Sequence, residues 1–134
     1  MARRLILDTG VLIERERSAK AIDEALTRDD DIVIAAVTAA ELRAGLELAS
    51  DRNRRSREEF LVSVFELFPV EPYDLKTAEA HGVLLAYVHK QGAPRGAIDL
   101  MIAATAVATG RILVTTDAKT RFGDLPGVEC VLLA

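Results

Sequence analysis

Short apolar runs that alternate with helical segments constrain the fold of this chain more than any other feature of its sequence. Leu5–Leu7, Ile32–Ala36 and Arg111–Thr115 are typical of strands buried on both faces, and a final strand is predicted over Glu129–Leu133. Strands that alternate with helices form a parallel sheet covered by helices on both sides. The sequence therefore predicts an α/β fold of three layers, α/β/α, with a central, mostly parallel sheet of four to five strands.

The segments between these runs carry apolar residues at helical spacing. Helices are predicted over Val11–Arg17, Ala19–Thr27, Thr38–Leu48, the stretch from Asp51 to about Phe68, Asp74–Lys90 and Ala97–Thr109. Gly110 stops the last of these helices, and Pro69 and Pro72 bracket a short extended piece around Val70. The acidic run Asp29–Asp31 is interpreted as a solvated turn.

Length and composition narrow the class of protein. The 134 residues predict one domain over the whole chain, 1–134, and a content of 50% hydrophobic and 28% charged residues excludes disorder. The single cysteine, Cys130, excludes an internal disulfide and a cysteine-built zinc site. No apolar run reaches the roughly 18 residues of a membrane span, and none near the start has the length of a signal peptide. We therefore expect a cytoplasmic protein without membrane contact.

The charge balance limits how the chain could bind nucleic acid. A net charge of −4 excludes broad binding by electrostatics alone, and the aromatic content of 4% leaves few side chains for base stacking. A nucleic-acid substrate is still compatible with this charge, because a divalent cation held by carboxylates makes its site far less negative than the sequence count.

Four carboxylates occupy equivalent places in the predicted layout. Asp8 follows the first strand, and Asp117 follows the strand that ends at Thr115. Glu41 lies in the first turn of the helix after the second strand, and Asp99 lies in the first turn of the helix that leads into the Thr115 strand. The carboxyl ends of parallel strands and the starts of antiparallel helices lie at the same edge of a sheet. All four acids are therefore expected at one rim.

Each acid also has a structural explanation when it is taken alone. Thr38 and Glu41 match a capping box, and Asp99 is favoured by the helix dipole. Asp117 matches a cap of the short turn that follows it, and Asp8 with the next two residues matches a turn or a helix N-cap. These explanations do not account for four carboxylates at one edge, where like charges repel and raise each other's pKa unless a cation lies between them.

The donor set indicates which cation would fit. Oxygen ligands without cysteine favour Mg²⁺ or Mn²⁺ over zinc, and magnesium usually keeps waters that can attack a phosphodiester. We hypothesise that Asp8 and Asp99 bind the metal most directly. Asp117 and Glu41 would complete the metal site through water and orient or deprotonate the attacking water.

The segments that carry these acids resemble the motifs of PIN-domain ribonucleases. The shared segments are Leu7–Gly10, the helix that carries Glu41, Ala97–Ala104 around Asp99, and Leu113–Asp117 followed by Phe122. The short single-domain form resembles the VapC toxins of bacterial toxin–antitoxin pairs. This resemblance covers essentially the whole chain.

The resemblance implies a PIN-like fold and a Mg²⁺- or Mn²⁺-dependent endoribonuclease that cleaves RNA. Thr115 matches the hydroxyl residue that supports the acids in such proteins, and Thr9 is a second supporting residue. Gly10 stands where many relatives have Ser or Asn, which removes one polar contact. The resemblance also implies a homodimer that is inhibited by a small antitoxin protein. The implied catalytic cluster is Asp8, Glu41, Asp99 and Asp117.

Basic side chains near the predicted rim are candidates for RNA contacts. Arg15 and Arg17 lie on the helix that follows the first acid, and Arg95 lies just before the Asp99 helix. The dense basic segment Arg52–Arg57 is interpreted instead as a solvated helix start. The candidate substrate-binding residues are Thr9, Arg15, Arg17 and Arg95.

Other functions match the residues less closely. A phosphatase that forms an aspartyl-phosphate on Asp8 usually has a second aspartate two residues later, where this chain has Gly10. A receiver-like signalling domain would have paired acids before its phosphorylated aspartate and a lysine after its last strand. A non-catalytic PIN module that binds RNA or an antitoxin is a further alternative, which the presence of all four acids disfavours.

Overall fold

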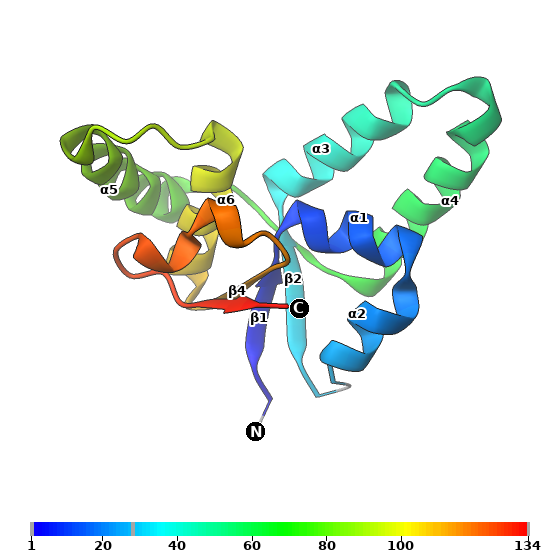
Figure 1. The fold of residues 1–134 in the computed structure, drawn as a ribbon, viewed down its shortest axis with the longest axis horizontal. Helices are drawn as coiled ribbons and strands as arrows, with labels where there is room; N and C mark the ends of the chain where they lie inside the picture. Colours follow the sequence, from blue (N-terminus) through cyan, green and yellow to red (C-terminus); the bar gives the residue numbers. More distant parts are fainter. Residues whose placement is uncertain (1, 28, 134) are drawn as a thin grey trace.

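The computed structural model describes residues 2–27 and 29–133, which form a five-stranded, wholly parallel sheet between two layers of helices (Figure 1). The strands run across the sheet in the order β3-β2-β1-β4-β5. They span β1 Arg4–Leu7, β2 Asp31–Ala35, β3 Val70–Glu71, β4 Ile112–Thr115 and β5 Cys130–Leu132. The predicted α/β/α architecture is confirmed.

The helices of the described residues form two groups on either side of this sheet. They span α1 Thr9–Arg17, α2 Ala19–Ala25, α3 Ala36–Glu47, α4 Asp51–Leu67, α5 Leu75–Gln91 and α6 Ala97–Thr109. In Figure 1 the hairpin of α3 and α4 rises on one side of the sheet's upper edge, and α5 with α6 lies on the other. No helix among the described residues is long and apolar enough to cross a membrane.

The central strand β1 is buried on both faces, as its continuous apolar run predicts. Leu5 and Leu7 pack in the cluster formed with α1, α2 and α4, whereas Ile6 packs in the cluster formed with α5 and α6. All three side chains are fully buried. Successive side chains of a strand point to opposite faces, so a strand between two helical layers needs apolar residues at every position.

The order of the strands determines where a ligand site can form. From β1 the chain proceeds outward through β2 to β3, and it then returns to the other side of β1 to form β4 and β5. The carboxyl end of β1 is therefore the point where the direction of winding reverses. Open α/β sheets bind ligands in the crevice outside the strands at such a switch point.

The acidic run Asp29–Asp31 is not a simple solvated turn, so that interpretation was wrong for two of its three residues. The Asp30 carboxylate accepts two hydrogen bonds from the Arg3 guanidinium, at 3.0 and 2.7 Å, and its side chain is almost fully buried. This contact keeps the pKa of Asp30 well below its usual range. Asp31 begins β2 and pairs with the buried Arg111 at 3.2 Å. Arginines at the amino ends of the strands thus bind these acids.

Several element boundaries differ from the predicted ones by one to two residues. Helix α1 begins at Thr9 rather than Val11, and α2 ends at Ala25 rather than Thr27. Helix α3 begins at Ala36, which had been assigned to the preceding strand. Gly110 ends α6 with a left-handed φ of 63°, as predicted. The early start of α3 changes the environment of Glu41.

Candidate active site

Asp8 lies at the carboxyl end of β1, where its backbone connects the sheet to α1. Its N–H donates to the carbonyl oxygen of Val114 at 2.9 Å, and its own carbonyl accepts from the N–H of Val11 at 3.0 Å. The residue is only 6% exposed. Its side chain does not cap α1 by a hydrogen bond, so the cap explanation does not hold for this acid.

The Asp8 carboxylate is directed instead at Thr115, the last residue of β4. Thr115 Oγ1 donates to Asp8 Oδ2 at 2.9 Å and accepts from the backbone N–H of Asp117 at 3.1 Å. Burial raises the pKa of Asp8, the hydrogen bond from Thr115 lowers it, and the charges of Asp99 and Glu41 raise it further. A single buried hydroxyl thus connects two of the four acids.

Glu41 is held by Thr9 and not by a capping box, so the capping-box prediction was wrong. Because α3 begins at Ala36, Thr38 lies inside its first turn and is fully buried, and Glu41 lies in the second turn. Glu41 Oε1 accepts a hydrogen bond from Thr9 Oγ1 at 2.5 Å, and the hydroxyls of Thr9 and Thr38 lie 3.0 Å apart. The helix-start explanation for this glutamate is thereby removed.

Asp99 occupies the first turn of α6 and is half-buried. Burial raises its pKa, the charge of Asp117 raises it further, and the charge of Arg95 lowers it. Gly96, the N-cap of α6, leaves room for this carboxylate, because a Cβ there would lie 3.0 Å from Asp99 Oδ2. Asp99 is therefore close enough to Asp117 for the charge of Asp117 to raise its pKa, and Gly96 leaves its carboxylate unobstructed.

Asp117 is exposed and caps the 3-10 helix that follows it. Its Oδ1 accepts from the backbone N–H of Lys119 at 2.9 Å, within the turn Ala118–Thr120. The structural explanation predicted for this residue is therefore correct. The same carboxylate still acts on Asp99, whose pKa it raises.

The four acids come from sequence positions 8 to 117, yet each is electrostatically coupled to another. Asp8 is coupled to Asp99 and Glu41, and Asp99 is coupled to Asp117. Across residues 2–27 and 29–133, no three acidic, histidine or cysteine side chains already stand in the arrangement of a metal site. The donor set nevertheless fits a hard divalent cation, because it is all oxygen and includes two carboxyls whose pKa values are raised.

The candidate arginines lie in different environments. Arg15 pairs with Asp23 at 2.9 Å, and Arg17 lies 3.7 Å from Glu14, both at the far end of α1 from Asp8. The structure does not bring these two arginines to the acids. Thr9 is buried and bonded to Glu41, so it supports an acid and presents no free hydroxyl to a substrate.

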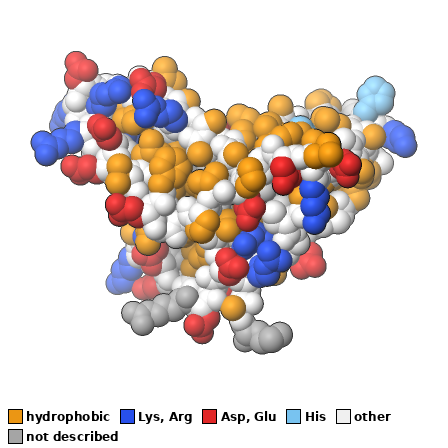
Figure 2. Space-filling view, turned by 180° about the vertical axis from the view of Figure 1, so that it is seen from behind, with side chains coloured by type: hydrophobic (Ala, Val, Ile, Leu, Met, Phe, Trp, Pro, Cys, Tyr) orange, Lys and Arg blue, Asp and Glu red, His pale blue; other side chains and the backbone are white. Residues whose placement is uncertain are grey.

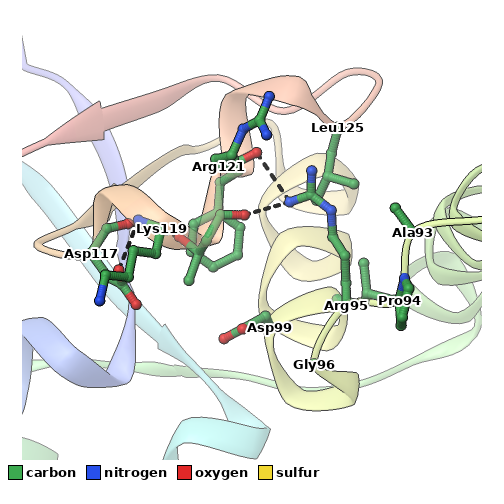
Figure 3. Close-up of a pocket in the computed structure, with 12 residues that line it drawn as sticks. Ala93, Pro94, Arg95, Gly96, Asp99, Asp117, Lys119, Arg121 and Leu125 are labelled. Carbon is green, nitrogen blue, oxygen red and sulfur yellow. Dashed lines mark hydrogen bonds between the residues drawn. The ribbon is translucent and has the colours of Figure 1, made fainter. Parts of the chain in front are cut away.

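Arg95 lies beside the acids in a cavity of about 360 Å³ (Figure 3). The cavity is formed by the loop before α6, the first turn of α6, and the loop after β4. Arg95 Nη1 donates to the carbonyl oxygens of Thr120 and Arg121, the second at 3.1 Å. Asp99 and Asp117 line the same cavity. Arg95 thus connects the loop before the Asp99 helix to the loop that carries Asp117.

The sequence interpretation missed several residues around these acids. Lys119 and Arg121 line the cavity with Arg95, and Gly96 makes room for Asp99. The first two had a detectable signal, since both are basic residues within four positions of a candidate acid. Thr38 had been assigned only to a cap, and its contact with Thr9 joins residues 29 positions apart.

The chain matches the PIN domain family model over residues 5–127. It is 29% identical to a ribonuclease VapC of Rickettsia bellii (strain RML369-C) over 126 residues, which cover 93% of this chain and 92% of the Rickettsia protein. The family match includes all four acids, and the match to the Rickettsia protein covers nearly the whole chain.

Solved structures agree in fold. DNA-bound VapBC from Salmonella typhimurium superposes with a TM-score of 0.86 and 25% identity, and the match covers 100% of both chains. VapBC-5 from Mycobacterium tuberculosis, described as a member of the VapBC family of toxin–antitoxin systems, has a TM-score of 0.78 and 31% identity, covering 96% of this chain and 98% of that one. The chain belongs to the PIN domain family, and over nearly its whole length it is similar to VapC ribonucleases.

Proposed function

We propose that this chain is a Mg²⁺- or Mn²⁺-dependent endoribonuclease and the toxin of a type II toxin–antitoxin pair. One observation carries the proposal: Asp8 is buried at the switch point of the sheet near carboxylates from distant positions, and its burial and their charges raise its pKa. Burying like charges together is unfavourable unless a bound cation offsets their repulsion. The ribonuclease VapC relative supports RNA as the substrate.

Asp8 and Asp99 would hold the metal most directly, with Asp117 completing the site through water. When bound, the cation supplies a lowered pKa for its water and charge stabilisation for the phosphate. Thr115 keeps the Asp8 carboxylate oriented through its hydrogen bond at 2.9 Å. Glu41, oriented by Thr9, is placed to orient the attacking water or accept its proton.

An antitoxin protein and a second copy of the chain are the proposed protein partners, and the cytoplasm is the proposed place of action. The Mycobacterium VapBC structure supports the antitoxin. A cavity of about 150 Å³ between α1, α3 and α4 supports it too, because it reaches from apolar Ile13 and Phe60 to Glu41. The exposed apolar side chains of α5, Leu75 and Val83 among them, support a homodimer. In Figure 2 hydrophobic side chains lie along the upper right of the molecule, the side of α5, as well as over its centre and left.

The proposed activity is tested with purified protein and total RNA. We expect cleavage in Mn²⁺ or Mg²⁺, none in EDTA, and a loss of at least about 100-fold for Asp8→Asn and Asp99→Asn. Asp23→Asn is the matched control, since it removes one carboxylate from α2 that only pairs with Arg15. Mapping new RNA 5′ ends after induction in cells identifies the substrate. Undiminished metal-dependent cleavage by a folded Asp8→Asn variant would refute the proposal.

A non-catalytic PIN module that binds RNA or an antitoxin is the second candidate. It is favoured by the hydrogen bond that uses Asp117 to cap its own turn. Calorimetric titration of Mn²⁺ separates the two functions. The nuclease requires that the wild type bind Mn²⁺ and that Asp99→Asn weaken this binding by about tenfold or more, whereas a binding module need not bind the metal.

A further inference from the structure

The cavity that contains Asp99 and Asp117 is lined by cations as well as by acids. In Figure 3 Asp99 points toward the side where Asp117 lies, and the guanidinium groups of Arg95 and Arg121 lie together away from Asp117. Its volume of about 360 Å³ is within the range of small-ligand sites, roughly 300–1,000 Å³. The proposed function uses only the acids of this cavity.

Three cations line this cavity, and we call them together the basic wall: Arg95, Lys119 and Arg121. Arg95 and Arg121 lie on the side away from Asp117, whereas Lys119 lies beside Asp117 (Figure 3). They are concentrated here although the whole chain carries a net charge of −4. Lys119 and Arg121 are exposed. Arg121 pairs with Asp124 at 2.8 Å, but both side chains are at least half exposed, and such surface pairs contribute little to stability. An incoming anion can therefore compete for Arg121.

The backbone holds the basic wall in place. Arg121 has a φ of 50°, the only left-handed backbone among the non-glycine residues that the structure describes. Arg95 donates to the carbonyl oxygens of Thr120 and Arg121, which belong to the peptide groups just before and just after the Arg121 Cα. An unfavourable backbone conformation persists where its surroundings determine it, and such positions are frequent at ligand sites.

The lining also indicates which part of a nucleotide would bind. Phe122, the aromatic residue of this cavity, is 1% exposed and presents no face on which a base could stack. The side chains of the basic wall are cations, and most hydrogen bonds from such side chains to nucleic acids go to phosphate and sugar. The wall is therefore suited to the sugar–phosphate backbone and reads no sequence.

We propose that the basic wall is a subsite for a second phosphate of the RNA, the one next to the phosphate that is cleaved at the acids. Arg121 and Lys119 contact this phosphate, and Arg95 is a positioning residue that holds the loop carrying them. The proposal rests on the proposed function for its substrate. It adds residues that orient the strand across the acids and make binding depend on salt.

The test measures binding without cleavage. Fluorescein-labelled single-stranded U10 and A10 RNAs are titrated in EDTA by fluorescence anisotropy over a range of NaCl concentrations. Lys119→Gln removes a charge, and Arg121→Asn removes a charge while retaining a residue that tolerates left-handed backbone. Each variant is expected to weaken binding about 3- to 10-fold and to reduce the slope of log K against log salt by about 0.7, equally for both RNAs.

Two controls have matched charge changes elsewhere. Arg52→Gln removes an exposed cation from the start of α4 and is expected to bind RNA as the wild type does. A third test variant, Asp124→Asn, removes the partner of Arg121 and is expected to tighten RNA binding about 2-fold. Its control is Asp23→Asn, which makes the same change in net charge on α2 and is expected to leave RNA binding unchanged. Circular dichroism confirms that each variant is folded.

The outcomes separate this inference from the proposed function. If the wild type cleaves RNA with Mn²⁺ but Lys119→Gln and Arg121→Asn bind like Arg52→Gln, the subsite is overturned and the nuclease stands. If the two variants lose affinity but the wild type shows no metal-dependent cleavage, the cavity binds RNA and the nuclease fails. Absence of RNA binding by the wild type overturns the subsite.

Discussion

The hydroxyl of Thr115 does more than fill space at the end of β4. It donates to buried Asp8 and accepts from the backbone of Asp117, so it fixes the orientation of one acid and the start of the loop that carries another. Valine has nearly the same shape without the hydroxyl. Thr115→Val therefore removes the hydrogen bonds of Thr115 with little change in packing.

Thr115→Val is expected to lower the rate of metal-dependent cleavage about 10- to 100-fold, because a hydrogen bond to a buried charge is lost. The bond from Thr115 lowers the pKa of Asp8, so its loss raises that pKa and moves the acidic limb of the pH–rate profile to higher pH. Thr115→Ser retains the hydroxyl and is expected to restore both the rate and the limb. An unshifted limb in Thr115→Val would show that Asp8 does not titrate in this reaction.

The contact between Thr115 and Asp8 could be anticipated from sequence, but the contact between Thr9 and Glu41 could not. Neighbouring parallel strands end together, so the apolar runs alone bring Asp8 and Thr115 to one edge. The Glu41 contact depends on where α3 begins, and helix boundaries rest on weak local preferences that packing overrides.

At the scale of elements, the candidate site depends on how α6 is joined to the loop after β4. Each contributes one acid, Asp99 and Asp117, and Arg95 bridges them through two carbonyl oxygens of that loop. No local pattern announces this contact, because it requires a left-handed conformation that arginine rarely adopts. The helix and the strand were predictable, but the bridge between them was not.

Arg95 influences the acids through its charge and through its geometry, and two substitutions separate these effects. Its charge lowers the pKa of Asp99, so Arg95→Gln is expected to raise that pKa and to move the acidic limb of activity to higher pH. Arg95→Lys retains the charge but loses the planar donor group. It is expected to leave the limb in place and to lower kcat about 3- to 10-fold. Equal pH profiles for the two variants would assign Arg95 a purely geometric role.

At the scale of the whole molecule, acids are paired with arginines at one end of the sheet and lie near other acids at the opposite end. At the amino ends of the strands, Arg3 and Arg111 bind Asp30 and Asp31, so the charges there are compensated within the chain. At the carboxyl end of β1, burial and the like charges beside it raise the pKa of Asp8. Parallel winding around a central β1 produces this asymmetry, since it collects helix starts and strand ends at one edge.

This arrangement lowers the free energy of unfolding until a cation binds, and the size of this penalty depends on pH. The pKa of Asp8 is raised in the folded chain, so Asp8 reduces the free energy of unfolding above that pKa. The penalty disappears below the ordinary Asp pKa of about 3.9, where the group is protonated in both states. Asp8→Asn is therefore expected to raise Tm in EDTA at pH 7 by about 2–5 °C and to show no difference near pH 3.

Added Mn²⁺ is expected to raise the Tm of the wild type above that of Asp8→Asn. A cation that binds only the folded chain stabilises it by about 2.7 kcal/mol at one hundred times its Kd, so wild-type Tm is expected to rise with Mn²⁺ while that of Asp8→Asn stays nearly constant. Differential scanning fluorimetry at pH 7 with EDTA, Mn²⁺ or Ca²⁺ measures both effects. Asp23→Asn, which changes net charge equally but lies on α2, should follow the wild type. Equal stabilisation of all three proteins by Mn²⁺ would show that the cation binds away from Asp8, and the repulsion among these acids would then need another explanation.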